Sequence, residues 1–353
     1  MRTACRLRAG ATWLPLRWRG MSHPTSHSTS QSTTAGQDAQ SMPTAHTEPK
    51  PMTDASISAS TRVMPERPFV DVMGGAARIE KKVLDHGFIA LVDAMPRLVP
   101  EGQTADQAIV QAARVSYGEG TKKVSEDRGL IRYLLRHRHT TPFEMVEFKF
   151  HVAMPIFVAR QWIRHRTANV NEYSARYSIV RDRFYKPTLD SVRKQSASNR
   201  QGGEQTFQMS DAQDIQTAQE FLGYLDDVEK AYEKYLSLTE RGVSRELARM
   251  GLPVNVYTEW YWKCDLHNVL RFLSLRMDSH AQLEIRAFGQ AMHDLLESIV
   301  PITMEAWRDY DFEGMHLTRL EIEALKNGSP TIATDNKREQ AEWEAKRARM
   351  GMV

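Results

Sequence analysis

One segment of the chain alternates strictly between apolar and polar side chains. Its even-numbered positions are Val146, Phe148, Phe150 and Val152, with charged or imidazole side chains between them. Because successive side chains of a strand point to opposite faces, residues 145–153 are predicted to form a strand with one buried face.

Two other segments are expected to lie outside helices. Residues 256–262 are aromatic and β-branched, which favours an extended conformation. Residues 191–213 are polar and contain two adjacent glycines, which predicts a mobile loop or an insertion.

Apolar residues recur at helical spacing in much of the remaining chain. The predicted helices cover residues 105–116, 128–137, 155 to beyond 163, 214–241, 244–250, 265–277 and 281–310. Pro155 suits the first position of its helix, and Gly242 is the expected stop after residue 241. Asp265 can cap the helix that follows it, and Pro301 is expected to bend the last helix.

The order of these elements shows no regular alternation of strand and helix. It favours an α+β domain in which long helices pack on a central, mainly antiparallel sheet. The helix at 128–137 would offer an apolar face made of Leu130, Tyr133 and Leu134. The chain has neither a Gly-x-Gly-x-x-Gly fingerprint nor a Walker loop, so a Rossmann unit and a P-loop are both excluded.

Composition separates the two ends of the chain from its body. The 353 residues carry 47 Lys and Arg against 44 Asp and Glu, and the excess of three positive charges falls within residues 1–60. Residues 21–60 contain 16 Ser or Thr, so residues 1–65 are predicted to be a disordered extension. We expect a folded domain over residues 66–325 and a charged tail over 326–353, in which 336–349 is either a helix or a frayed end.

The first twenty residues are rich in arginine and contain no acidic residue. This is typical of an organelle transit peptide and also of an over-extended gene start. A non-functional extension is slightly favoured, and a cytoplasmic location is expected, with an organelle transit peptide as the alternative. No apolar run approaches the ~20 residues of a membrane-spanning helix.

The densest polar segment is 160–183. Its six arginines are Arg160, Arg164, Arg166, Arg176, Arg181 and Arg183. Arginine makes planar, bidentate contacts with phosphate or carboxylate, and the interleaved aromatic residues could stack on a flat ring. Arg160 and Arg164, four apart, are expected to share a helix face. The segment therefore indicates a nucleotide pocket, with an arginine-rich solvated helix or an RNA-binding module as the alternatives.

Other groups in the sequence carry weaker signals. His280 lies in the polar stretch 276–286 without a second histidine or a carboxylate at ligand spacing, so no metal is assigned. The segment 136–144 is either a cation-rich helix end or another anion contact. Cys5 and Cys264 are the only cysteines, which excludes a disulfide framework, and Cys264 is expected to be a buried, inert thiol.

The sequence resembles one known family over roughly residues 83–310. Arg164-His165-Arg166 followed after seven residues by Ser174 is the signature of flavin-dependent thymidylate synthases. The segments that also resemble this family are HTTPFE at 139–144, PIFVARQW at 155–162, LPVNVYTEWYW at 252–262 and FLSLRMDSHAQLEIR at 272–286.

The resemblance implies an enzyme that methylates deoxyuridine monophosphate (dUMP) to thymidylate. Methylenetetrahydrofolate would supply the carbon, FAD would relay the hydride and NADPH would reduce the flavin. The family has an α/β fold with a central twisted sheet and helices, and its members are homotetramers with active sites at subunit interfaces. No metal, nucleic acid or membrane partner is implied.

The resemblance also implies roles for individual residues. Arg276 would be catalytic, favouring the N3-deprotonated pyrimidine, as a nearby positive charge does. The implied dUMP-binding residues are Gln161, Trp162, Ile163, Arg164, Glu172, Tyr173, Ser174, Ala175, Arg176, Arg249 and Arg276. The implied FAD-binding residues are His139, Thr141, Arg164, His165, Arg166, Glu172, Asp265, Leu266, His267 and Arg271. Ser174 is a nucleophile by residue type, but a hydrogen bond to the nucleotide is favoured, and Gln282 is placed near the same pocket.

The sequence departs from the family pattern at three places. Asp265-Leu266-His267 stands where many members have Asn-Ala-Arg, and Arg271 stands where many have His or Asn. Both positions are associated with FAD in the family. Thr140 stands where an acidic residue is common.

Overall fold

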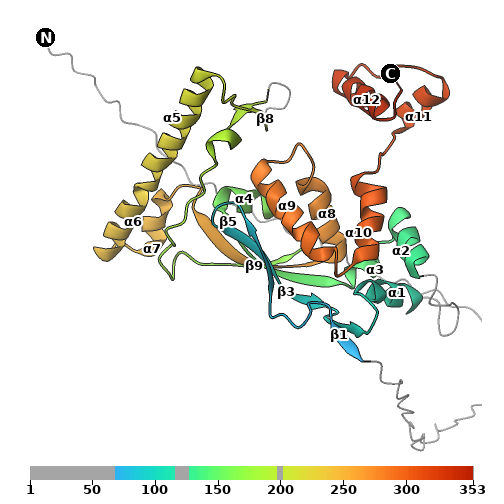
Figure 1. Cartoon of the computed structure of the whole chain (residues 1–353), viewed down its shortest axis with the longest axis horizontal. Helices are drawn as coiled ribbons and strands as arrows, with labels where there is room; N and C mark the ends of the chain where they lie inside the picture. Colours follow the sequence, from blue (N-terminus) through green and yellow to red (C-terminus); the bar gives the residue numbers. More distant parts are fainter. Residues whose placement is uncertain (1–67, 116–126, 197–201, 353) are drawn as a thin grey trace, which may run out of the picture. The chain divides into compact units, whose positions relative to one another are not determined.

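The computed structural model describes residues 68–115, 127–196 and 202–352. All of them belong to one compact unit, Val63–Val353 (Figure 1). The extension predicted for residues 1–65 lies outside the described residues.

A five-stranded antiparallel sheet is the centre of this unit, as the sequence predicts. Its strand order is β2-β3-β5-β9-β6. Figure 1 labels β3, β5 and β9 of this sheet. The strands are β2 (Ile79–Val83), β3 (Gly87–Met95), β5 (Glu147–Pro155), β9 (Tyr257–Asp265) and β6 (Asn169–Glu172). The expected strand at 145–153 is β5, and the expected extended segment at 256–262 is β9.

Two further pairs of short strands lie outside the central sheet. β1 (Phe69–Asp71) pairs with β4 (Leu98–Pro100), and β7 (Arg193–Gln195) pairs with β8 (Gly203–Thr206). The β7–β8 hairpin falls where the sequence predicts a mobile loop or an insertion, and the loop alternative is wrong for the residues of both strands. The sequence signal for a strand is weak here, because β7 consists of polar residues that are exposed or only half-buried.

Helices complete the described part of the chain. They are α1 (Asp106–Val115), α2 (Asp127–Arg136), α3 (Thr141–Glu144), α4 (Ile156–Trp162), α5 (Ala212–Glu229), α6 (Ala231–Glu240), α7 (Arg245–Ala248), α8 (Leu266–Arg276), α9 (Leu283–Leu296), α10 (Pro301–Trp307), α11 (Arg319–Lys326) and α12 (Lys337–Arg349). Short 3-10 turns cover Leu189–Ser191 and Arg249–Gly251, and a π turn covers Arg308–Phe312.

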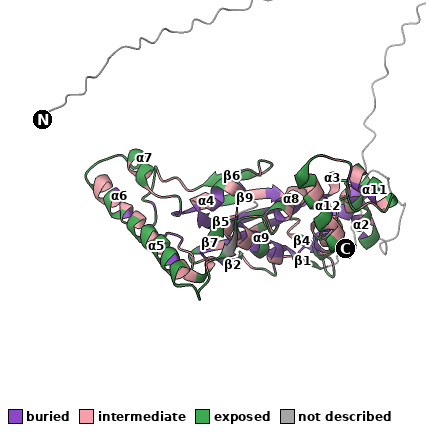
Figure 2. Ribbon diagram, turned by 90° about the horizontal axis from the view of Figure 1, so that it is seen from above, coloured by how far each residue is buried: buried purple, intermediate pink, exposed green. Residues whose placement is uncertain are grey.

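One face of the sheet forms the main core. Phe148 and Phe150 on β5 are fully buried, and so are Phe272 on α8 and Phe288 on α9. In Figure 2 the buried residues concentrate on the strands and on the helices packed against them, whereas α5 and α6 are largely exposed. The alternation read from the sequence around β5 is therefore confirmed. The apolar face of α2 differs from the expected one: Ile131 and Leu134 are buried, and Tyr133 is 46% exposed.

The helix that follows Pro155 is shorter than expected. It ends at Trp162, and Pro155 is its N-cap residue with an extended conformation. The chain turns after Trp162 because β6 must run antiparallel to β9 from Asn169 onwards. Arg164 lies in that turn, so the prediction that Arg160 and Arg164 share a helix face is wrong.

Two long predicted helices are each divided. Residues 214–241 form α5 and α6, which meet at Lys230, and the second ends before Gly242, whose φ of +92° confirms the expected stop. Residues 281–310 are interrupted between α9 and α10 rather than bent at Pro301. Proline has no N–H to continue a helix, and a new helix begins there.

Asp106 of α1 accepts hydrogen bonds from the first backbone N–H groups of α10. Its carboxylate accepts hydrogen bonds from the backbone N–H groups of Ile302 and Thr303, at 3.0 and 3.1 Å, and from the Thr303 hydroxyl at 2.6 Å. Burial raises the pKa of Asp106, and these hydrogen bonds oppose that change. The carboxylate supplies the acceptors that a helix N-terminus lacks.

The C-terminal segment contains a helix rather than a frayed end. Trp343 of α12 is fully buried in a small cluster with Ala324 and Ile332. Lys346 Nζ donates to both carboxylate oxygens of Glu321, at 2.8 and 2.9 Å. Within the described ranges, no helix has the length and apolar character needed to cross a bilayer.

The composition of the main core predicts how one substitution changes stability. We expect Phe150→Ala to lower the free energy of unfolding by about 3–5 kcal/mol, because it removes a fully buried ring and leaves a cavity. Urea denaturation measures the change. Tyr224→Ala on α5, where the side chain is 61% exposed, is the control and should change stability by less than about 0.5 kcal/mol. Equal effects of the two substitutions would contradict the assignment of the core.

Candidate active site

Helix α8 carries Arg276 to the edge of the sheet. Asp265 caps this helix, as predicted, by accepting the backbone N–H of Asn268 at 2.9 Å. Leu270 and Leu273 pack its inner face into the core. Arg276 lies in the last turn, where a positive charge is favourable for the helix dipole.

Two acceptors from the segment after β5 hold the Arg276 guanidinium. Its Nε donates to Nε2 of His165 at 3.0 Å, and its Nη2 donates to the backbone oxygen of Gln161 at 3.2 Å. The side chain is half-buried, and desolvation lowers its pKa. Arginine nevertheless stays charged in proteins, so the site presents one oriented positive charge.

His165 is neutral at ordinary pH. Burial lowers its pKa to about 4, and the positive charges of Arg276 and Arg271 contribute to the shift. The ring also lies edge-on to Phe272, with centroids 4.9 Å apart. Because Nε2 accepts a hydrogen bond, the remaining ring proton belongs on Nδ1.

The predicted dUMP loop is fixed from strand β9. The Glu172 carboxylate accepts the Thr258 hydroxyl at 2.7 Å, and the Tyr173 N–H donates to the Glu259 backbone oxygen at 2.8 Å. The Ser174 hydroxyl accepts the Arg176 N–H at 3.3 Å, and no described side chain contacts it as a base. The loop is anchored, and its serine has no partner that would make it a nucleophile.

A second group of predicted residues lies around that loop. Arg245 of α7 donates to the Tyr177 backbone oxygen at 2.7 Å, and Ala175 packs in the same small cluster as Ala248. Arg249 follows directly in the next turn. Among the described residues, no hydrogen bond or ion pair links this group to Arg276.

The arginine-rich segment divides into two parts. Arg181 forms an ion pair with Glu259, and Arg183 Nη1 is 4.0 Å from the same carboxylate. Arg164 and Arg166 form no ion pair within the described part of the chain and stay exposed. Arg164 and Arg166 are therefore available for an anionic ligand.

Sequence reasoning missed the role of Glu259. Its carboxylate also lies 3.4 Å from His151 Nε2, in a charged cavity of about 500 Å³ on the sheet face opposite the main core. The alternation along β9 indicates this face, since Glu259 precedes the buried Trp260. Its partners Arg181 and Arg183 lie at least 76 positions earlier in the sequence, and no local pattern indicates that they contact Glu259.

The predicted FAD residues are only partly accessible. The Leu266 side chain is fully buried, and its N–H donates to the Val146 oxygen at 2.7 Å. The Trp162 side chain, predicted for dUMP, is also fully buried. These two side chains belong to the core, because each begins or ends a helix that packs on the sheet. His139 and Thr141 are exposed at the junction of α2 and α3.

The other predicted residues lie at the surface or half-buried. Ile163 is 45% exposed, His267 is half-buried, and the Asp265 carboxylate is occupied by Asn268. Arg271 is exposed and has no ion-pair partner in the described ranges. The side chain of Gln161 donates to that of Gln282, so the structure does bring Gln282 to this site. In the same ranges, no group of three His, Cys, Asp or Glu could hold a metal ion.

Comparisons with known proteins agree on one family. Residues 97–302 match the family model described as thymidylate synthase complementing protein. A flavin-dependent thymidylate synthase of Dictyostelium discoideum is 64% identical over 286 residues, covering 81% of this chain and 92% of the relative. Another, of Gluconobacter oxydans, is 50% identical over 289 residues, covering 79% and 91%.

A solved structure supports the fold. A UMP/dUMP methylase, PolB of Streptomyces cacaoi, bound with 5-Br UMP, has a TM-score of 0.54 and 32% identity, covering 65% of this chain and 96% of that one. The fold and these matches define an enzyme of the methyltransferase class. Within that class, the chain belongs to the flavin-dependent thymidylate synthase family.

The low pKa of His165 predicts a pH dependence of stability. Between pH 6.5 and about 4 the unfolded chain binds a proton at this position and the folded chain does not, so stability falls as the pH falls through this range. His165→Gln keeps an acceptor and should remove that part of the slope. Urea unfolding at pH 6.5 and 4.5 measures it. His316→Gln, at an exposed position, is the control, and an unchanged slope in His165→Gln would contradict the assignment.

Proposed function

We propose that the chain converts dUMP to thymidylate by reductive methylation. 5,10-Methylenetetrahydrofolate is the carbon donor and NADPH the reductant. The observation that carries this proposal is the half-buried guanidinium of Arg276, fixed by His165 and Gln161. All three residues lie in segments that resemble the family.

An oriented positive charge is what this chemistry needs. Uracil C5 is a poor nucleophile until the ring becomes electron-rich, and a cation close to N3 favours the deprotonated ring. Arg276 would supply that cation without reorganisation, because its two acceptors hold it in place before substrate binds. The neutral ring of His165 leaves this charge uncompensated.

A thiolate route finds no support in the described residues. Cys264 is 3% exposed, and its thiol donates to the Thr167 backbone oxygen at 3.2 Å. Burial raises its pKa well above the usual range. This thiol is the inert group that the sequence predicts, so activation of C6 by Cys264 is disfavoured.

Exposed arginines would hold the anionic groups of dUMP and FAD. Arg164, Arg166 and Arg271 are exposed and lack ion pairs in the described ranges, which fits them for phosphate or diphosphate. FAD, when bound, would supply hydride transfer. The chain's own residues would bind and orient its phosphates, and Arg271 lies close enough to His165 to lower the pKa of that ring.

We also propose a homotetramer with active sites shared between subunits. Arg276 and the loop at 172–176 form two groups with no described polar contact between them. Beside Arg249, Leu247 and Met250 are 61% and 77% exposed, as expected of an interface. A cytoplasmic location and a catalytic domain at 66–325 also stay predictions.

An RNA-binding function is not favoured. Arg181 and Arg183 are occupied by Glu259, and the family assignment covers the same segment. The remaining exposed arginines suit a small anionic ligand as well as they suit a nucleic acid.

Replacement of Arg276 tests the proposed chemistry. We expect Arg276→Ala to lower kcat/KM for dUMP methylation by about 100-fold or more, because it removes a preorganised charge from the site. The variant should retain flavin, as its visible absorbance would show. Arg338→Ala on the exposed side of α12 is the matched control. Wild-type methylation by Arg276→Ala would exclude the proposed role.

A visible absorption spectrum tests flavin binding and its coupling to the nucleotide site. The purified chain should be yellow, and dUMP should perturb the flavin bands and stimulate NADPH oxidation. Omission of methylenetetrahydrofolate should abolish thymidylate formation. A colourless protein that stays inactive after FAD is added would overturn the proposed function.

A further inference from the structure

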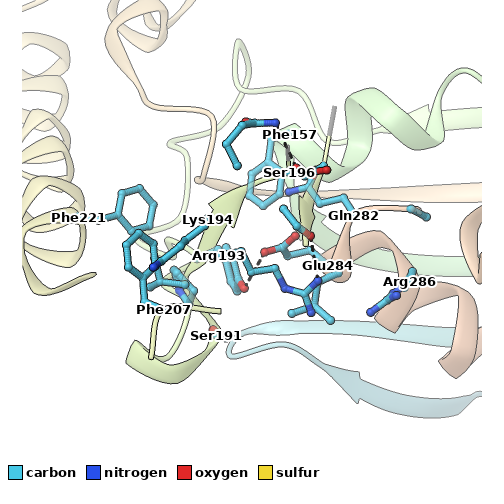
Figure 3. A pocket seen from close by; sticks show the side chains of 18 of the residues that line it. Phe157, Ser191, Arg193, Lys194, Ser196, Phe207, Phe221, Gln282, Glu284 and Arg286 are labelled. Carbon is cyan, nitrogen blue, oxygen red and sulfur yellow. Dashed lines mark hydrogen bonds between the residues drawn. The ribbon is translucent and has the colours of Figure 1, made fainter. Parts of the chain in front are cut away.

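A cavity of about 1080 Å³ lies between the β7–β8 hairpin, α5 and the start of α9 (Figure 3). It adjoins the candidate active site, because Gln282 lines it and also accepts the side-chain hydrogen bond of Gln161. We refer to it as the hairpin cavity. Apart from Gln282, its lining has no part in the function proposed above.

Aromatic side chains form much of the wall. Phe157 and Tyr185 lie with ring centroids 5.8 Å apart, and Phe207 and Phe221 line the wall toward α5 (Figure 3). Phe221 is 40% exposed, although it belongs to a large apolar residue type. Such walls favour a flat ring, which gains contact area and stacking on insertion.

The hairpin brings an incompletely used guanidinium to this wall. Arg193 Nη1 donates to the Gly203 backbone oxygen at 3.3 Å, but its Nε is buried and has no hydrogen-bond partner among the described residues. A Cβ at Gly203 would lie 2.7 Å from Arg193 Cβ, so the two strands pack too closely for a larger residue. A buried donor without an acceptor is unfavourable, and the protein encloses this Nε. An anion in the cavity would meet the Nη groups of the same guanidinium, which lines the cavity wall.

The two neighbouring basic side chains, Lys194 and Arg286, differ in whether a carboxylate pairs with them. Lys194 forms an ion pair with Asp214 at 2.7 Å, whereas Arg286 donates only to the Ser279 backbone oxygen, at 3.1 Å. Arg193 and Arg286 therefore form no ion pair within 4 Å in the described ranges, although the charge of Arg286 contributes to the lowered pKa of Asp278.

One acid also lines the cavity. Glu284 accepts the Tyr185 hydroxyl at 3.1 Å (Figure 3), and burial raises the pKa of Tyr185, so this phenol keeps its proton. A carboxylate oxygen of Glu284 remains available to accept from a ligand N–H group. The lining thus combines a flat apolar wall, anion donors and one acceptor of N–H groups.

We propose that the hairpin cavity binds a planar aromatic compound carrying both an amino group and an anionic group, either carboxylate or phosphate. Arg193 and Arg286 bind the anion, Glu284 accepts from the amino group, and the ring packs between Phe157 and Phe221. The site takes its ligand independently of catalysis at Arg276.

Isothermal titration of the full chain tests this proposal with two probes. AMP carries an aromatic amine and a phosphate, and 4-aminohippurate carries an aromatic amine and a carboxylate. Each is titrated with and without saturating dUMP. We expect at least one probe to bind once per chain, with an affinity that dUMP leaves unchanged, and the preferred probe identifies the anion.

Variants locate the binding. Arg193→Gln and Phe221→Ala should each weaken the bound probe by about 10-fold or more, whereas Arg338→Gln on α12 should leave it unchanged. Phe221 is partly exposed, so its substitution should preserve folding, as thermal denaturation would show, even if Arg193→Gln destabilises the hairpin. Equal affinity of Phe221→Ala and the unmodified chain would overturn the proposal.

Two other results would also overturn it. Neither probe binding at millimolar concentration would show that the cavity lacks this specificity, and displacement by dUMP would place the probe in the nucleotide site. A chain that binds the probe but never methylates dUMP would refute the proposed function alone.

Discussion

The pairing of β5 with β9 determines where the chemistry of this chain can take place. The two strands pair over nine residues, from Glu147 opposite Asp265 to Pro155 opposite Tyr257. Helices α4 and α8 therefore leave the pair at opposite ends and meet over its buried face. Trp162 and Phe272 mark the meeting point, with ring centroids 4.5 Å apart. The ends of both helices then lie together, which places Arg276 against Gln161 and His165.

The same sheet separates two groups of charged side chains. On the core side of the sheet Arg276 has neutral acceptors, so its positive charge is retained for a ligand. On the opposite side Glu259 contacts Arg181 and His151, and this carboxylate compensates local positive charge. The two charged sites lie on opposite sides of the sheet, because neighbouring residues of β9, such as Glu259 and the buried Trp260, point to opposite faces.

The sequence predicted what depends on local pattern. The alternation at 145–153 identified β5, and Asp265 and Gly242 were recognised as a cap and a stop by their residue types. The end of α4 at Trp162 was not predictable, because it follows from the position of β6 beside β9. The hydrogen bond that Arg276 donates to His165 joins residues 111 positions apart, so it could not be predicted without the fold. The resemblance named both residues but gave them separate roles, one toward FAD and one toward dUMP, and those roles stay predictions.

The carboxylate of Asp106 has a consequence for how the chain can be shortened. It joins α1 to the start of α10 across 196 positions of sequence. A chain cut between α9 and α10 would lose α10, and the fully buried carboxylate of Asp106 would lose the N–H groups that donate to it. A deletion near the C-terminal end of the domain would therefore destabilise α1, the first helix of the domain. Any minimal version of this enzyme therefore has to extend through α10, even though the matched family segment ends at residue 302.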